Sequence, residues 1–168
     1  KKARRAPVAQ KFSDAIADYQ KALELINARS PHGDDPLLPY IFYNRGLLYV
    51  RAHKFADATV DFEKTLEIQP DYPDVKNHLA WLLATCPDAR VRNPTRAVEL
   101  ANEELKRAST DASILDTVAA SYAAAGDFEQ AIAMQEKAIS LLNDEPSKLR
   151  FSARLDLYRD QQPFLSAE

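Results

Sequence analysis

The sequence predicts an all-α protein built from repeated pairs of antiparallel helices. Ala and Leu, two of the strongest helix formers, account for 27 and 19 of the 168 residues. Only 3 Gly are present, too few for the hairpin turns, bulges and phosphate-binding loops of β and α/β folds. In addition, four similar segments recur along the chain, which is typical of a repeat protein.

Each of the four recurring segments predicts one helix of a helix pair. An Ala stands early in every segment, with a larger apolar residue eight positions later, and three segments have an aromatic residue three positions before the Ala. This spacing places the Ala and the larger residue on one helix face. The segments are residues 11–26, 54–70, 94–109 and 127–142, and the alanines are Ala15, Ala58, Ala97 and Ala131.

Another amphipathic segment precedes each of the last three repeats, at residues 37–52, 75–85 and 113–125. Apolar or small residues recur there at the three-and-four spacing of a helix face. Equivalent positions hold small residues, which we expect to allow close approach of the partner helix; they are Gly46, Ala80 and Ala119. Pro70 is expected to end the helix before it.

The domain organisation follows from these segments. We expect a basic linker, or the remainder of a preceding region, over 1–10, since the chain begins without Met. A repeat array is expected over 11–145, divided into a half unit 11–30 and full units 37–72, 73–110 and 111–145. Residues 146–164 predict one more helix, which caps the last repeat or alternatively docks a partner. Its charged residues, Arg154 among them, are expected on a solvated outer side.

Charge and hydropathy exclude several classes of partner. The net charge is −3, with 22 basic and 25 acidic residues spread along the chain, so we expect no basic surface for nucleic acid. No apolar run is long enough to span a membrane, and no apolar segment follows the basic start as in a signal peptide. The single cysteine excludes an internal disulfide and leaves the cellular compartment open.

The residues that usually perform catalysis lack the required neighbours. No serine or cysteine motif accompanies any of the three histidines, and the zinc-binding HExxH pattern is absent. His32 could make at most a weak metal contact in a solvated loop, and Cys86 is expected as a small packed residue in a turn. The carboxylate pairs are adjacent in sequence, so we expect solvated surface charges; they are Asp61 with Glu63 and Glu103 with Glu104. We therefore predict a non-enzymatic chain without metal or cofactor.

The repeats resemble those of the tetratricopeptide repeat family. The 34-residue unit of this family has an aromatic residue, Gly and Tyr in the first helix, and Ala, Phe, Ala and Pro in and after the second. Residues 39–72 match at Phe42, Gly46, Tyr49, Phe55, Ala58, Phe62 and Pro70, but Arg45 and Thr65 depart from the usual Leu and Ala. Residues 112–145 match at Leu115, Val118, Ala119, Tyr122, Gly126, Phe128, Ala131 and Ala138. The unit over 73–109 has a lengthened turn at 86–94.

This resemblance implies a right-handed α-solenoid whose first helices line a concave groove for a peptide or partner protein. The implied partner-binding positions are Tyr40, Tyr43, Asn44, Leu47, Arg51, Asn77, His78, Trp81 and Asp116. Core packing is the alternative for the aromatic residues, and Trp81 in particular is open between groove and core. Of the positions with which the family clamps a C-terminal carboxylate, Asn44 alone matches, so we expect recognition of apolar and aromatic side chains.

We therefore predict a non-catalytic protein-interaction module. One alternative is a self-assembling scaffold, in which exposed apolar helix faces pair to form a homo-oligomer. A further alternative is the regulatory arm of a larger multidomain enzyme. The sequence names neither the partner nor the oligomeric state.

Overall fold

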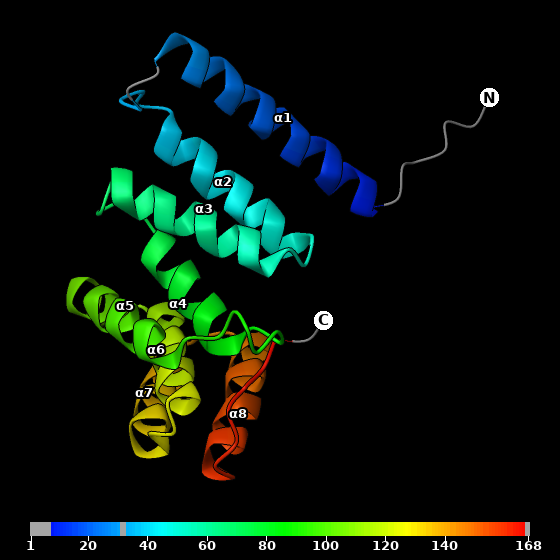
Figure 1. Ribbon diagram of the computed structural model, residues 1–168. Helices are drawn as coiled ribbons and strands as arrows, with labels where there is room; N and C mark the ends of the chain where they lie inside the picture. Colours follow the sequence, from blue (N-terminus) through cyan, green and yellow to red (C-terminus); the bar gives the residue numbers. More distant parts are fainter. Residues whose placement is uncertain (1–7, 31–32, 167–168) are drawn as a thin grey trace. The chain divides into compact units, whose positions relative to one another are not determined.

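The computed structural model describes residues 8–30 and 33–166, which form eight α-helices and no β-strand (Figure 1). The chain divides into two compact units, Lys1–Val75 (unit 1) and Lys76–Glu168 (unit 2). The predicted linker over 1–10 lies mostly outside the described residues, and the first helix begins at Val8. The helices are α1 (Val8–Arg29), α2 (Leu38–Arg51), α3 (Phe55–Ile68), α4 (Val75–Thr85), α5 (Pro94–Arg107), α6 (Ala112–Ala124), α7 (Phe128–Ser140) and α8 (Glu145–Arg159).

In unit 1, α2 and α3 form an antiparallel hairpin and α1 packs against α2 (Figure 1). The hairpin is close because Gly46 faces the ring of Phe62, which is fully buried. A Cβ atom at Gly46 would lie only 2.7 Å from the nearest carbon of that ring. The small residue predicted at this position is therefore required for the approach of the two helices.

A buried ion pair joins the two helices of this hairpin. Arg45 Nε and Nη2 donate to the two carboxylate oxygens of Asp61, each at 2.7 Å, and the Asp61 residue is 1% exposed. Burial raises the pKa of the Asp61 carboxyl, while Arg45 counteracts this effect. The expectation that Asp61 is a solvated surface charge is wrong, because Arg45 replaces the usual Leu and supplies a counter-charge inside the hairpin.

Unit 2 contains helices α5 to α8 and all of α4 except its first residue. The small residues predicted at helix contacts are buried there: Ala80, Ala97, Ala119 and Ala131 are each 0% exposed. Side chains of Asn93, Asp111, Asp127 and Asp144 accept backbone N–H groups at the starts of α5, α6, α7 and α8. These caps satisfy donors that a helix leaves unpaired at its first turn.

The lengthened turn between α4 and α5 is held by hydrogen bonds. Arg92 Nη1 donates to the carbonyl oxygens of Cys86 and Pro87 at 2.7 and 3.2 Å, and Asn93 N–H donates to the Leu83 carbonyl at 3.0 Å. Cys86 is 1% exposed, and burial raises the pKa of its thiol. Glu104 in α5 is also buried, at 6% exposure, and accepts from Arg107 at 2.6 Å. It is therefore not the solvated charge that the sequence predicts.

The last helix occupies most of the segment predicted for it. α8 spans Glu145–Arg159, against a predicted segment of 146–164 in which Pro163 is expected beyond the helix end. Gln161 adopts the left-handed conformation, with φ of 56°, and its N–H donates to the Tyr158 carbonyl at 3.0 Å. Gln162 N–H donates to the Leu157 carbonyl at 2.9 Å, which completes a Schellman motif. Residues 160–166, here called the return segment, then run back along α8 (Figure 1).

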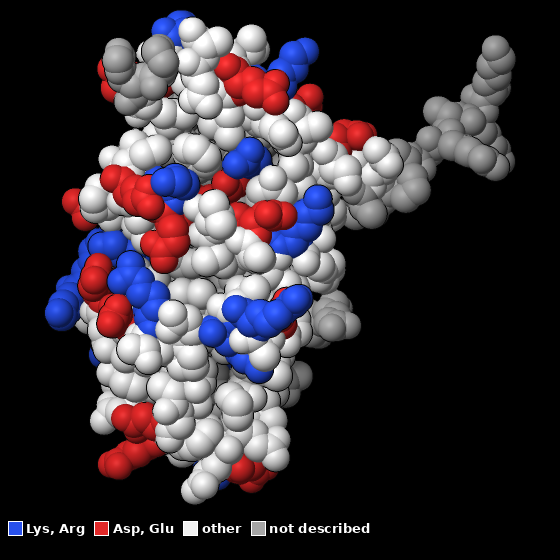
Figure 2. Space-filling view, in the orientation of Figure 1, with Lys and Arg blue, Asp and Glu red and all other residues white. Residues whose placement is uncertain are grey.

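Over the described part of the chain, no helix is long and apolar enough to span a membrane. Figure 2 shows acidic and basic side chains interspersed on the face turned to the viewer. This face therefore presents no continuous basic surface of the kind that binds duplex nucleic acid.

Candidate functional site

A groove of about 560 Å³ lies within unit 2, between α4, α6 and α8. Each helix contributes residues at the spacing of a single face: 77, 78 and 81 from α4, 113, 116 and 117 from α6, and 147, 150, 151 and 154 from α8. The lining residues are Asn77, His78, Trp81, Ala112, Ser113, Asp116, Thr117, Leu142, Ser147, Arg150, Phe151 and Arg154.

An ion pair between α6 and α8 forms part of the groove wall. Arg154 Nε and Nη2 donate to Oδ1 and Oδ2 of Asp116 at 2.8 and 2.7 Å, and both residues are 6% exposed. Gln135 of α7 adds a third hydrogen bond to Asp116 Oδ1 at 2.8 Å. Burial raises the pKa of the Asp116 carboxyl, and the charge of Arg154 opposes that rise. Arg154 is thus part of a buried network and not on the solvated outer side of its helix.

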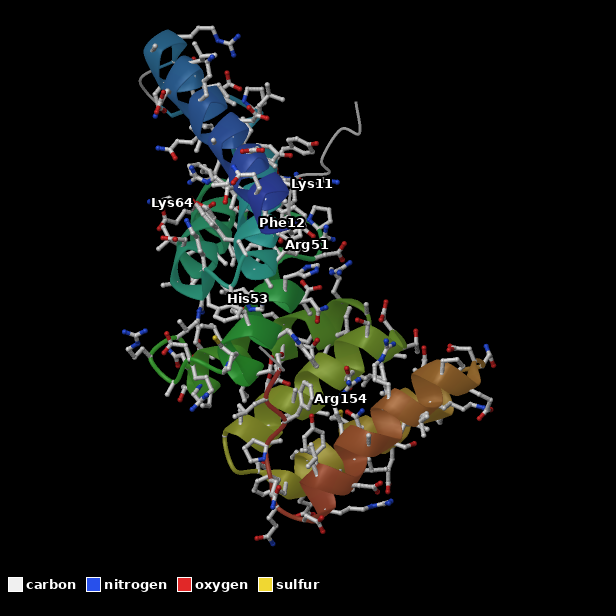
Figure 3. The ribbon with its side chains drawn as sticks, turned by 90° about the vertical axis from the view of Figure 1, so that its right-hand side faces the viewer. Lys11, Phe12, Arg51, His53, Lys64 and Arg154 are labelled. Carbon is white, nitrogen blue, oxygen red and sulfur yellow. The ribbon has the colours of Figure 1, made fainter. Side chains whose placement is uncertain are left out.

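The Arg154 guanidinium also contacts aromatic rings. Its Cζ atom lies 4.6 Å from the ring centre of Phe151 and 5.6 Å from that of Trp81. Figure 3 shows the side chain extending from α8 toward α4 and α6. Because a cation over an aromatic face is attracted by the ring, Arg154 fixes the position of Trp81 as a wall of the groove. Trp81 is half-buried and faces the groove, which answers the question that the sequence left open.

One polar group of the groove is available to a ligand. Arg150 is exposed and forms no ion pair within the described chain; Arg150 Nη2 donates to Ser147 Oγ at 3.4 Å. The groove can therefore bind a carboxylate or carbonyl at Arg150. Asn77 Oδ1, by contrast, is buried away from solvent and has no hydrogen-bond partner among the described residues.

The structure brings four of the nine sequence-predicted binding residues into this groove, namely Asn77, His78, Trp81 and Asp116. Asp116 lies there with its carboxylate already bound by Arg154 and Gln135. The sequence does not predict that α8 lines the groove. It places Arg150, Phe151 and Arg154 only in a capping helix. Their i, i+1 and i+4 spacing is the signal that places them together on one face of that helix.

The other five predicted residues lie on α2 in unit 1. Tyr40 is 53% exposed, Arg51 is exposed at the helix end, and Leu47 is half-buried. Asn44 Nδ2 donates to the Tyr40 carbonyl at 2.7 Å, within the same helix. Tyr43 packs between Phe62 and Tyr72, with ring centres 6.1 and 5.1 Å away, so its ring belongs partly to the core of unit 1. Burial raises the pKa of the Tyr43 hydroxyl.

The residues considered for catalysis or metal binding do not gather into a site where the structure describes them. No group of three His, Cys, Asp or Glu side chains is placed to hold a metal ion among these residues. His53 lies exposed in the turn between α2 and α3, with its ring edge-on to Phe55. His32 lies outside the described residues.

Comparison with known proteins agrees with this architecture. Residues 112–143, which contain α6 and α7, match the model of the tetratricopeptide repeat family. This match supports a tetratricopeptide repeat protein. The family is generally one of non-catalytic interaction modules that bind protein partners. No curated protein matches the sequence significantly.

A solved structure with a similar fold is MamA, from residue 41 to its end, of Desulfovibrio magneticus RS-1. The two structures superpose with a TM-score of 0.66 at 17% sequence identity, over 91% of this chain and 84% of the MamA chain. The predicted all-α, tetratricopeptide-type solenoid of stacked helix hairpins is thereby confirmed. At this level of identity the likeness concerns the fold alone.

Proposed function

We propose that this tetratricopeptide repeat protein is a non-catalytic interaction module whose unit 2 groove binds an extended segment of a partner protein. The observation that carries the proposal is the convergence of α4, α6 and α8 on one groove, in which an aromatic wall lies beside the exposed Arg150 guanidinium. Binding sites of proteins commonly combine an apolar wall with a few placed polar groups.

Different residues of the groove are placed to contact different parts of the ligand. Trp81 and Phe151 offer apolar area, and aromatic residues are enriched among the energetically important positions of interfaces. Arg150 at the rim is placed to pair with an acidic side chain of the ligand.

The binding test begins with selection from a random peptide library displayed on phage, using the full chain as bait. Selected peptides are then titrated by calorimetry against wild type, Trp81→Ala and Arg150→Ala. We expect each substitution to weaken binding by about tenfold or more, since each removes an anchor of the interface. Arg159→Ala is the matched control, because Arg159 is also on α8 but pairs with Glu136 at the surface.

Two outcomes contradict the proposal. Unchanged affinity in both Trp81→Ala and Arg150→Ala, with native circular dichroism, would show that the ligand binds elsewhere. Tyr40→Ala, at a predicted position that is 53% exposed, then reports on unit 1: loss of binding in that variant alone assigns the ligand to the residues of α2. Failure to select any peptide that binds the wild-type chain also counts against the groove.

Self-association is a second candidate function, and one apolar patch of unit 1 supports it. Leu25 and Leu37 are 64% and 53% exposed and border a pocket of about 350 Å³ between α1 and α2. Exposed apolar patches of this kind mark surfaces that associate. Light scattering over a range of concentrations tests this candidate, with Leu25→Glu as the variant expected to remain monomeric. A wild-type monomer at every concentration excludes it.

A further inference from the structure

The return segment (residues 160–166) lies next to the groove of unit 2, because Trp81 and Arg154, which line the groove, also contact Phe164. The Schellman motif at the end of α8 reverses the chain, and Pro163 follows without an N–H group to extend the helix. Phe164 of the segment then packs on residues of α4, α6 and α8, and Ser166 reaches the end of α4. Residues 162–166 are non-helical.

Phe164 holds the return segment in place. Its ring centre lies 5.7 Å from that of Trp81 and 5.4 Å from Cζ of Arg154. It also packs against the cluster of Ala119, Ala123 and Tyr158. Trp81 and Arg154 thus line the groove and also contact the return segment, so the groove and the Phe164 site share a wall.

The end of the return segment pairs with backbone and side chain of α4. Ser166 N–H donates to the Thr85 carbonyl at 2.8 Å, and the Ser166 and Thr85 hydroxyl oxygens lie 2.8 Å apart. Thr85 is 1% exposed beneath this contact. One aromatic side chain and a few hydrogen bonds are how a short extended peptide would be bound, and here the peptide is supplied by the chain itself.

We propose that the return segment is an intramolecular occupant of the ligand groove, displaced by partner segments that place an aromatic side chain in the Phe164 site. This inference rests on the proposed function of the groove. It also specifies the ligand: an extended peptide with an aromatic residue seated between Trp81, Arg154 and the alanines of α6. Because only a few residues separate Phe164 from α8, the segment competes at a high effective concentration.

Few side chains attach the return segment. Leu165 is 45% exposed and anchors little apolar surface. Gln161 adopts a left-handed conformation that favours Gly, so the reversal is strained. A ligand that offers the same aromatic contact and also reaches Arg150 gains a contact that the return segment does not make.

The test uses Trp81, the only Trp of the chain, as a fluorescent reporter beside Phe164. The Phe164→Ala variant of the full chain is compared with wild type and with Leu165→Ala, a control at the neighbouring exposed position. We expect Phe164→Ala to shift Trp81 emission to longer wavelength, because the ring loses its cover. Leu165→Ala is expected to leave the emission unchanged.

Binding in trans provides the second measurement. A synthetic peptide with the sequence of residues 160–166 is titrated into both chains, followed by calorimetry, alongside the same peptide with Ala in place of Phe. We expect the Phe peptide to bind Phe164→Ala at least about tenfold more tightly than wild type, whose site is filled in cis. The Ala peptide should bind neither chain.

The proposal is overturned if Phe164→Ala, with native circular dichroism, keeps the wild-type emission or binds the Phe peptide no better than wild type does. A separate comparison distinguishes this failure from failure of the groove itself. Library-selected peptides that depend on Arg150 but bind wild type and Phe164→Ala equally would leave the groove function intact and remove only the competition. Peptides that ignore Arg150 and Trp81 would instead remove the groove function.

Discussion

Replacement of Arg154 by methionine would test the buried ion pair of unit 2. Methionine keeps an unbranched apolar stem but removes the charge that faces Asp116. In the native structure Asp116 accepts three hydrogen bonds, two from Arg154 and one from Gln135. The variant leaves the carboxylate with the Gln135 bond alone, in a position that is 6% exposed.

The expected loss in the free energy of unfolding follows from this geometry. Loss of one partner of a buried ion pair typically destabilises a protein by about 3–5 kcal/mol, because the remaining charge is stranded away from water. We expect Arg154→Met to lower the free energy of unfolding by about that amount at neutral pH. The double variant Arg154→Met/Asp116→Asn should recover more than half of the loss, since an amide oxygen still accepts from Gln135 and carries no charge.

The stability of the variant should depend on pH in a direction that the pKa of Asp116 determines. Burial already raises the pKa of Asp116, and removal of Arg154 raises it further. A carboxyl whose folded-state pKa lies above its unfolded value contributes stability below the unfolded pKa, and this contribution is lost as the pH rises through the folded pKa. The deficit of Arg154→Met relative to wild type should therefore shrink as the pH is lowered toward about 4.

Urea unfolding followed by far-ultraviolet circular dichroism measures these differences. Arg159→Met is the control, because Arg159 pairs with Glu136 at 2.8 Å with both side chains about half exposed. We expect this control to change stability by less than about 1 kcal/mol. The reasoning is refuted if Arg154→Met loses less than about 1 kcal/mol, or if the double variant is as unstable as the single one.

Three further substitutions test packing by the same unfolding measurement. Gly46→Ala should cost about 1–3 kcal/mol, because its Cβ would lie 2.7 Å from the buried Phe62 ring; wild-type stability would show that the ring can move. Arg45→Leu should cost about 3–5 kcal/mol by stranding Asp61, and Arg45→Leu/Asp61→Leu should restore most of it; equal loss in both contradicts this. Tyr158→Phe should be neutral or stabilising by up to about 1 kcal/mol, since its buried hydroxyl has no hydrogen-bond partner among the described residues; a larger loss would reveal one.

The helices and their contact faces could be predicted from sequence because both depend on local spacing. Ala58, Ala97 and Ala131 occupy equivalent places in their repeats, and each is fully buried. A small side chain at a fixed helical position has few uses other than close helix packing, so the pattern is specific. The groove positions of α4 and α6 follow from the same register.

The charged parts of the groove could not be predicted in this way. Whether Arg154 is solvated or buried depends on Asp116, which is on another helix far along the sequence, and neither residue alone predicts the pair. Hydrophobic periodicity assigns charged residues to the surface by default. This default fails for Asp61 and Arg154 alike, because each has a counter-charge in a neighbouring helix.

The course of the return segment could not be predicted from local sequence patterns either. Leu155, Leu157 and Tyr158 favour a continued helix, and the reversal at Gln161 uses a residue that seldom adopts positive φ. Its destination at Thr85 is a contact between positions 81 residues apart. The Schellman motif turns the chain, and the contacts of Phe164 with Trp81 and of Ser166 with Thr85 hold it there.

The Arg45–Asp61 pair constrains how this sequence can diverge. Either residue can be replaced singly only at the expense of a stranded charge in the hairpin, so the path to the usual Leu at position 45 passes through an unstable intermediate. The two sites are therefore epistatic: a substitution that is harmless in a repeat without the pair is damaging in this one. Relatives that descend from a chain with this pair should retain both charges or neither.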